Sequence, residues 1–407
     1  MKYLVYYDTP ANEAENRNYV LSAAEKIDYI CSVLNRIGHS VELISASASR
    51  NRRGCRGKKV QLSDRTSLKL FSCIGTGILP KRLLGRLLFN TRLFLYLIFH
   101  IQKNETVLVY HSLGYAGMVA LLKKCKGFQL ILEVEEIYAD VNGRAEDRKK
   151  EYTVFSAADG FLFPTQLLND RINTRNKPWA VAHGSYQAKP DLGCDVFAED
   201  PCKDGKRKIH CVYAGTFDPR KGGTMAAAAA EFLPEQYHVH ILGFGTKEQT
   251  EQITALINRI SSVSRCMVTY DGLLSGEDYI KFLQSCDIGL STQNPDASFN
   301  ETSFPSKILS YLANGLQVVT TRIPAVEASA IGRHVHYYDR QTPESIAEAI
   351  LRVKLDDSPD IREILRTLDL KFENELKILL TEHLDRNGNS RRMGAYEGEN
   401  GGLADKI

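Results

Sequence analysis

The sequence contains no Cys-x2-Cys pair, and its nine cysteines are odd in number. This spacing argues against a zinc framework and against a disulfide scaffold. Several cysteines stand inside apolar runs, such as Cys211 in IHCVYAG and Cys286 in LQSCDIGLS. We expect them to be small buried side chains of a protein that works in a reducing compartment.

Long apolar runs and a strong charge of one sign are also missing. No uncharged apolar stretch reaches about 18 residues, so no membrane-spanning helix is expected. The opening MKYLVYYDTP lacks the features of a signal peptide, and its apolar run up to Asp8 predicts a buried first strand. The formal net charge of +3 is too small to indicate general nucleic-acid binding. We therefore expect a cytoplasmic protein.

What the chain has is length and a regular alternation. Its 407 residues, 43% of them apolar, suffice for two buried cores. Helical segments separate short apolar runs, which occupy residues 2–7, 40–45, 106–110, 128–133, 160–163, 179–182, 209–215, 238–243, 266–270, 287–291, 317–320 and 335–338. Apolar strands separated by helices indicate parallel sheets covered on both faces. The pattern predicts an α/β fold with two doubly wound, Rossmann-like domains that face each other across a cleft.

A polar, charged segment at 188–208 separates the two halves and is predicted to be a linker. The first domain is therefore expected at 1–187 and the second at 209–355. A long helix is expected within 356–385. The Gly-rich tail at 386–407 has the composition of a disordered segment.

The segment YAGTFDPRKGGTMAAAAAEFL, residues 213–233, carries the strongest chemical signal. A strand ends at Gly215, a loop brings Arg220 and Lys221, and Gly222 precedes an Ala-rich helix. Glycines, a helix N-terminus and basic side chains together suit a phosphate group. The alternative is a basic turn before a surface helix. The segment is not a P-loop, because Gly-x4-Gly-Lys-Ser/Thr does not occur.

A second signal lies in NETSFPSKILSYLANGLQVV, residues 300–319. Pro305 suits the start of a helix, which places Ser306 and Lys307 in its first turn. A cation is unfavourable there unless an anion compensates it. This favours a ligand over a solvated lysine. Weaker nucleotide-site signals are the glycines of LGFG and YDGLL, which each follow a strand.

In this order the elements resemble the C-terminal domain of family 4 (group 1) glycosyltransferases of the GT-B type. The resemblance covers about 209–330 and extends to the first half in architecture only. It implies a nucleotide-diphosphate sugar donor, a terminal helix that packs back on the first domain, and no further cofactor. The donor would contact Gly215, Thr216, Arg220, Lys221, Gly243, Gly245, Gly272, Leu273, Ser306, Lys307 and Ser310.

The chain departs from the family pattern at several positions. Thr216 replaces the first diphosphate-binding Arg, and Arg220 is expected to substitute for it. Ser310 replaces the second Glu of the family's Glu-x7-Glu pair, and Glu301 is expected to orient the donor sugar. The catalytic-cleft His of the first domain is missing, and ILEVEEIY places Glu135 beside Glu136 there instead. We therefore expect Glu301, Lys221 and Glu135 to act in catalysis.

The acceptor side is expected at the carboxyl ends of the strands of the first half. Further candidates there, each better explained as an ordinary loop residue, are Asp8, Thr9, Asn12, His111, Ser112 and Gly114. His183, Gly184 and Ser185 close the domain, near where the linker faces the cleft. The segment 81–103, KRLLGRLLFNTRLFLYLIFHIQK, is basic at its ends and apolar within. It is either a buried helix or a helix that lies on an anionic membrane surface at the inner face of the cell membrane.

The resemblance implies a retaining transfer, without a required metal, to a polysaccharide or lipid-linked oligosaccharide precursor. No aspartate pair and no His/Asp cluster with ligand spacing is visible in the sequence, in agreement with a metal-free site. Two alternatives stay open. One is a noncatalytic nucleotide-sugar-binding scaffold subunit, and the other is a nucleotide-sugar epimerase on the same fold.

Overall fold

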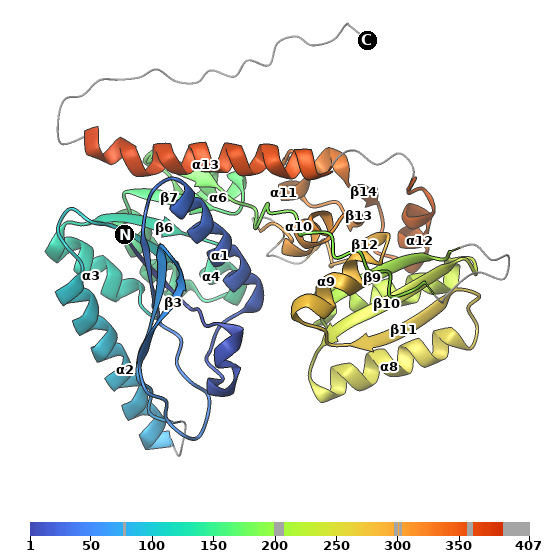
Figure 1. The fold of residues 1–407 in the computed structure, drawn as a ribbon, viewed down its shortest axis with the longest axis horizontal. Coiled ribbons are helices and arrows are strands. Elements are labelled where there is room, and N and C mark those ends of the chain that lie inside the picture. Colours follow the sequence, from blue (N-terminus) through green and yellow to red (C-terminus); the bar gives the residue numbers. More distant parts are fainter. Residues whose placement is uncertain (76–78, 199–206, 297–299, 301–302, 356–360, 386–407) are drawn as a thin grey trace, which may run out of the picture.

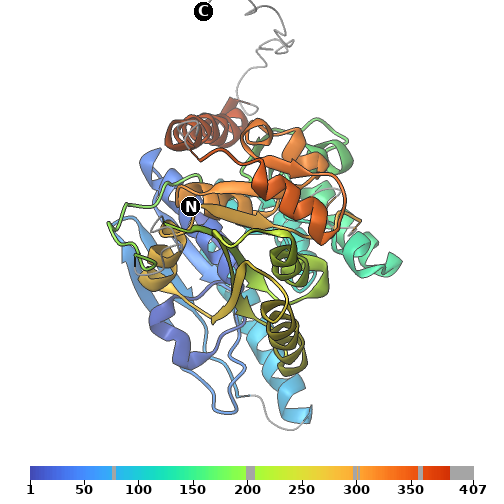
Figure 2. The same cartoon turned by 90° about the vertical axis from the view of Figure 1, so that its right-hand side faces the viewer.

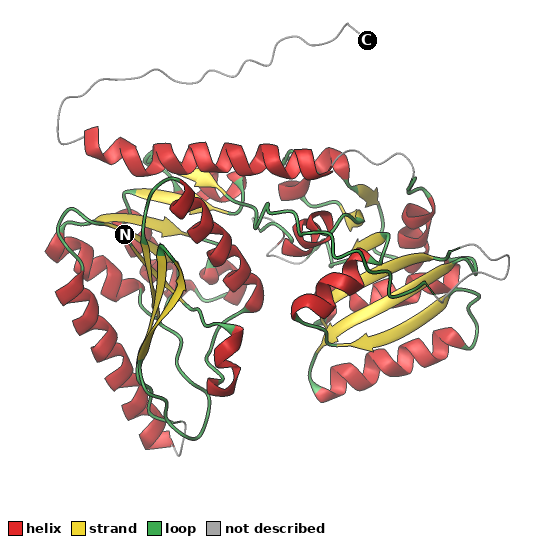
Figure 3. Ribbon diagram, in the orientation of Figure 1, coloured by secondary structure: helices red, strands yellow, loops and turns green. Residues whose placement is uncertain are grey.

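The computed structural model describes residues 1–75, 79–198, 207–296, 300, 303–355 and 361–385 (Figure 1). Two sheets lie within them, and helices cover both faces of each sheet (Figure 3). This confirms the predicted α/β class with two Rossmann-like parallel-sheet domains. Glu301 and residues 199–206 of the linker lie outside the described residues, as does the tail from 386.

The first sheet has the strand order β3-β4-β2-β1-β5-β6-β7-β8. Its strands are β1 (Lys2–Val5), β2 (Val41–Ser45), β3 (Lys58–Ser63), β4 (Thr66–Leu70), β5 (Thr106–Tyr110), β6 (Gln129–Glu133), β7 (Gly160–Phe163) and β8 (Trp179–Val181). All neighbouring strands are parallel except β3 and β4. This hairpin was not predicted from the sequence, because β3 alternates exposed and half-buried residues at the sheet edge and has no continuous apolar run.

Alternate residues of β1 point to the two faces of the first sheet, as strand geometry requires. Tyr3 packs in one core with Ile27 of α1, and Leu4 packs in another with Leu93 of α2. The helices of this domain are α1 (Leu21–Arg36), α2 (Leu79–His100), α3 (Ala116–Lys126), α4 (Tyr138–Asn142), α5 (Ala145–Ala157) and α6 (Gln166–Ile172), with a 3-10 segment at Pro10–Glu15. None of the described helices is both long and apolar enough to cross a bilayer.

The second sheet is entirely parallel, with the order β11-β10-β9-β12-β13-β14. Its strands are β9 (Ile209–Thr216), β10 (Tyr237–Phe244), β11 (Met267–Gly272), β12 (Ile288–Ser291), β13 (Gln317–Thr321) and β14 (His336–Tyr338). The strand order changes direction between β9 and β12. Ligands of such sheets bind at this point, beyond the carboxyl ends of the strands.

Helices cover the second sheet on both faces. They are α7 (Gly223–Ala228), α8 (Lys247–Ser261), α9 (Gly276–Gln284), α10 (Ser306–Ala313), α11 (Pro324–Glu327) and α12 (Pro343–Leu351), with 3-10 segments at Pro219–Lys221 (η2), Ala229–Phe232 and Gly332–His334. Alternate residues of β9 again separate the faces. Cys211 packs with residues of α7 and α8, and Val212 packs with residues of α9 and α10.

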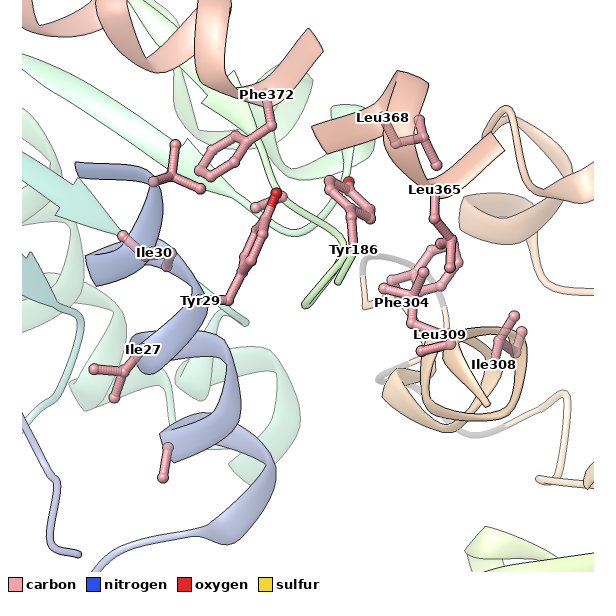
Figure 4. Close-up of a cluster of buried hydrophobic side chains, with 14 of the residues drawn as sticks. Ile27, Tyr29, Ile30, Tyr186, Phe304, Ile308, Leu309, Leu365, Leu368 and Phe372 are labelled. Carbon is pink, nitrogen blue, oxygen red and sulfur yellow. The ribbon is translucent and has the colours of Figure 1, made fainter. Parts of the chain in front are cut away.

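The long helix α13 (Ile361–Asp385) runs along the outside of both domains (Figures 1 and 2). In Figure 4, Phe372 lies beside Tyr29 of α1, and Leu365 lies above Phe304 and Leu309 of the second domain. One continuous apolar cluster therefore joins the two sheets beneath α13. It fixes how the carboxyl ends of the two sets of strands face each other.

Candidate functional site

The loops after β9 and β12 meet at the point where the strand order changes direction. The Thr292 hydroxyl donates a hydrogen bond to the Gly222 carbonyl at 2.8 Å, and the Asn294 N–H donates to the Arg220 carbonyl at 2.9 Å. Gly222 adopts a φ of 82°, and a side chain there would collide with the backbone of Thr292. A glycine is therefore required where η2 turns into α7.

Lys307 reaches this edge from the first turn of α10. Its Nζ lies 3.5 Å from the centroid of the Tyr213 ring, and a side chain at Gly215 would collide with it. Within the part of the chain that the structure describes, this buried Nζ has no hydrogen-bond partner. Burial lowers the pKa of Lys307 well below its ordinary value, and repulsion from Lys221 lowers it further. An unpaired buried cation is costly, and a bound anion would compensate it.

Lys221 lies at the end of η2 and faces the first domain. Burial lowers its pKa most, and Arg220 acts in the same direction, whereas Asp218 and Glu136 oppose the shift. Glu136 follows β6 in the first domain, and its pKa is raised by burial and by the charge of Glu135. Lys221 and Glu136 thus interact electrostatically across the cleft. The structure places Lys221 within electrostatic range of Lys307 and of Glu136, the residue next to Glu135.

Residues 208–356 match the family model described as Glycosyl transferases group 1. This stretch is a group 1 glycosyl transferase domain. The match covers the second sheet and its helices, including both lysines of the site. No curated protein sequence matches the chain.

Solved structures resemble the chain over nearly its whole length. An E. coli structure described as trehalose-6-phosphate bound with UDP-2-fluoro glucose has a TM-score of 0.64 at 12% identity, over 96% of this chain and 100% of that one. A Burkholderia xenovorans UDP-forming α,α-trehalose-phosphate synthase in complex with glucose-6-phosphate has a TM-score of 0.63 at 10% identity, over 95% and 99%. The Burkholderia multivorans synthase gives 0.64 at 11% identity, over 96% and 99%. At these identities the likeness shows the GT-B fold alone, and with the family match it makes the chain a glycosyltransferase.

Two carboxylates at the end of β6 and just after it, Glu133 and Glu135, have partners in their own domain. Lys26 of α1 donates to Glu135, and the Tyr3 hydroxyl donates to Glu133. Glu133 is fully buried, and burial, followed by the charge of Glu135, raises its pKa to about 8. The sequence analysis missed Glu133 because it reads as the last apolar-strand residue of FQLILE. Its proximity to Glu135 two positions later was the available signal.

His111 follows β5, and its Nε2 lies 2.9 Å from Oε1 of Glu151 on α5. Glu151 also accepts the backbone N–H groups of Tyr138 and Ala139 at 2.7 and 2.8 Å. Both side chains are buried, with exposed fractions of 2% and 0%. The pair holds α4 and α5 to the strand end. A role of His111 toward the acceptor stays a prediction.

Other predicted donor contacts lie around the lysines, and their roles stay predictions. The Arg220 guanidinium binds the Asp218 carboxylate at 2.6 Å and is 62% exposed. Ser306 is exposed, and the Ser310 side chain hydrogen-bonds Tyr279. Gly243, Gly245, Gly272 and Leu273 follow or end β10 and β11, and Thr216 ends β9 beside Gly215. Leu273 is 63% exposed.

The remaining predicted acceptor-side residues form local hydrogen bonds. Asp8 Oδ1 accepts from the Thr9 N–H and from Asn12 Nδ2, each at 2.8 Å. Ser112 Oγ accepts from the Gly114 N–H at 3.1 Å. The imidazole of His183 stacks on Phe304 of the second domain at 4.5 Å, and burial lowers the pKa of His183 to about 4. The segment 183–185 therefore belongs to the junction between the domains.

Two tyrosines of the site were not predicted. Tyr213 supplies the ring beneath Lys307, and its hydroxyl donates to the Thr216 carbonyl at 2.8 Å. Tyr311 of α10 accepts the Ala214 N–H at 2.9 Å. The alternation of β9 places Tyr213 and Gly215 on one face of the strand, which was a usable signal. The Tyr311 contact depends on how α10 packs, and no local pattern shows it.

Proposed function

We propose that this glycosyltransferase moves a sugar from a nucleotide-diphosphate sugar to a polysaccharide or lipid-linked oligosaccharide precursor. The observation that carries the proposal is the buried ammonium of Lys307, which has no hydrogen-bond partner among the described residues. It lies at the strand-order change where open α/β sheets bind ligands. A diphosphate there would supply the missing negative charge.

The same charges suit the chemistry of the departing nucleotide. Negative charge develops on the diphosphate as the bond to the sugar breaks, and Lys307 and Lys221 stabilise it. The two lysines supply positive charge at this edge without a metal ion. A retaining course agrees with a structural neighbour described as a case of glycosyltransfer with retention. UDP is the first nucleotide to test, because another neighbour is described as bound with UDP-2-fluoro glucose.

The test is a calorimetric titration of UDP and GDP into the parent protein and Lys307→Met. A charge-assisted contact of about 1.5–3 kcal/mol predicts a roughly tenfold to hundredfold loss of affinity. Lys247→Met is the matched control, because Lys247 of α8 is 84% exposed and forms an ion pair with Glu251 of its own helix. Equal nucleotide affinity in the parent and Lys307→Met, with the fold intact, would remove the proposed donor site.

The surface of α2 supports a lipid-linked acceptor. Its 22 residues contain no Asp or Glu. Leu93 and Leu97 are buried on its inner face, whereas Leu87, Leu95 and Phe99 are 64%, 46% and 79% exposed. Exposed Arg86 and Arg92 lie on the same helix. An apolar and basic outer face is typical of helices that lie on anionic membranes.

Sedimentation with vesicles tests this contact. The protein should bind vesicles rich in phosphatidylserine, release them at high salt, and bind neutral vesicles weakly. Leu87→Glu and Phe99→Glu should each abolish binding without unfolding the protein, since both side chains are exposed. Leu273→Glu, which alters an exposed leucine of the other domain, is the control. Parent protein that stays in the supernatant with anionic vesicles would restrict the acceptor to a soluble glycan.

The carboxylates after β6 favour a second candidate, a nucleotide-sugar epimerase. Glu133 and Glu136 both have raised pKa values, and such groups can exchange protons with a substrate. An epimerase incubated with a nucleotide-sugar in D2O without acceptor incorporates deuterium into the sugar. Transfer or hydrolysis without deuterium incorporation supports the transferase. Nucleotide-sugar binding without either reaction would leave the scaffold role.

A further inference from the structure

Three buried histidines come together on one face of the second sheet. His210 lies on β9, and His238 and His240 lie on β10. Strand pairing sets His238 directly beside His210, and the alternation of β10 turns His240 to the same face. One ring nitrogen from each histidine lies within 4.8 Å of the others. We propose that these residues bind one divalent transition-metal ion of the zinc class.

The surrounding hydrogen bonds orient the rings for this role. The Thr269 hydroxyl donates to Asp271 at 2.9 Å, so its oxygen is left to accept from His238 Nε2 at 3.1 Å. Nδ1 of His240 lies 3.2 Å from the Asp271 carboxylate and therefore carries the proton. These bonds leave Nδ1 of His238 and Nε2 of His240 unprotonated. A carboxylate behind a histidine in this way is typical of metal ligands.

The ring nitrogen that His210 would offer is already close to that of His240. Nδ1 of His210 and Nε2 of His240 are 3.0 Å apart and share one proton in a hydrogen bond. Two ligands about 2.0–2.1 Å from a tetrahedral zinc ion are about 3.3 Å apart, so a small separation of the rings admits the ion. The His210 proton then moves to Nε2 of the same ring.

The site is distinct from the donor edge and lies beneath the linker. Phe197 stacks on His210 and His240 with centroids 4.1 and 4.5 Å apart, and Phe282 of α9 meets His240 edge-on at 5.2 Å. Figure 1 shows α9 and the linker on the same side of β9 and β10. A bound ion would thus hold β9 and β10 together beneath α9 and the linker. Its role is structural, and it does not depend on the proposed transfer reaction.

The experiment uses the full chain after removal of metals with a chelator. Co²⁺ is titrated in while visible absorption reports tetrahedral coordination, and Zn²⁺ is then added as a competitor. Exposed Cys125 and Cys194 are replaced by Ser throughout, because free thiols also bind these ions. We expect one Co²⁺ per chain, displaced by one Zn²⁺, with a higher melting temperature in the loaded form.

Asp271→Asn keeps the shape of the carboxylate and should weaken metal binding roughly tenfold to hundredfold. His240→Gln should abolish it. His336→Gln is the matched control, because His336 lies in the same sheet on β14 and bonds Gln317 at 3.2 Å. If His240→Gln does not fold, the metal affinity of Asp271→Asn decides whether the three histidines bind the ion. Absence of saturable Co²⁺ binding, or equal binding by Asp271→Asn and His336→Gln, would show that the triad is a hydrogen-bonded core of neutral imidazoles.

Discussion

At the carboxyl ends of the strands, the first sheet presents carboxylates and the second presents lysines. The two sets of side chains differ in the partners that they find within the protein. In the first domain, Glu135 is paired with Lys26, and Oε2 of Glu133 accepts from Tyr3, whereas Oε1 of Glu133 has no hydrogen-bond partner among the described residues. In the second, the buried Nζ of Lys307 has no hydrogen-bond partner among the described residues. A buried polar group without a partner in the protein calls for an explanation, and a bound ligand is one. Because the unpartnered group of the second domain is basic, the comparison favours this domain as the place of the proposed donor anion.

The largest expected effect comes from breaking the hydrogen bonds around Glu151 in the first domain. Glu151→Ala leaves His111 Nε2 and two backbone N–H groups without an acceptor. We expect the free energy of unfolding to fall by about 3–5 kcal/mol, measured by urea denaturation. Glu146→Ala removes an exposed carboxylate from the same helix and should change it by about 0.5 kcal/mol or less. Similar losses in both variants would mean that the network adds little.

Removing a buried charged group from the second domain should have the opposite effect on the free energy of unfolding. Lys307→Met removes a buried cation and keeps most of the side-chain volume. The free energy of unfolding without ligand should rise by on the order of 1 kcal/mol, because burying an ion costs more and the Tyr213 ring offsets only part. Urea denaturation with and without UDP separates this gain from the loss of binding. A marked loss of stability without nucleotide would show that Lys307 has a structural partner.

The strand ends and helix starts around the proposed donor site could be predicted from the sequence because their signals are local. Gly215, Lys221 and Lys307 each stand where a strand ends or a helix begins, and parallel strands bring such positions to one edge. The structure places the two lysines close enough to repel each other. The long helix expected within 356–385 is likewise observed, as α13 at Ile361–Asp385.

What the sequence did not show depends on pairing between distant segments. The histidine triad arises because the register sets His210 beside His238, and no spacing along the chain encodes that register. The partner of His111 is Glu151, 40 positions away on a helix whose inward face is polar. The edge strand β3 lacks the continuous apolar run that revealed the other strands.

A smaller effect is expected from the protonation of Glu133 in the first domain. Its folded-state pKa is about 8, above the ordinary 4.5, so the folded protein binds the extra proton between these values. The free energy of unfolding therefore falls as pH rises from about 4.5 to about 8 through this group. Glu133→Gln should flatten that dependence and raise the melting temperature at pH 8 more than at pH 5. Parallel pH curves for parent and variant would place an ionised Glu133 in the folded protein.

The smallest effect concerns Arg220, the exposed member of the cationic edge. Asp218 holds its guanidinium and would compete with a bound diphosphate for it. Asp218→Asn keeps the hydrogen bond from the Arg220 N–H to this side chain at the start of η2 but removes the competing charge. An exposed ion pair is worth about 0.2–1 kcal/mol, so UDP affinity should rise by roughly twofold to fivefold.

The double variant Asp218→Asn/Arg220→Ala separates the two explanations. If the released guanidinium binds the diphosphate, the gain in UDP affinity disappears when Arg220 is absent. If the gain in UDP affinity persists, Asp218 acts by repelling the diphosphate directly. Arg220 then does not take over the role of the family's arginine, whose position Thr216 occupies here. The stability of all variants should stay within about 0.5 kcal/mol of the parent, because Arg220 is 62% exposed. Calorimetric titration of UDP and urea denaturation of the three proteins decide the matter.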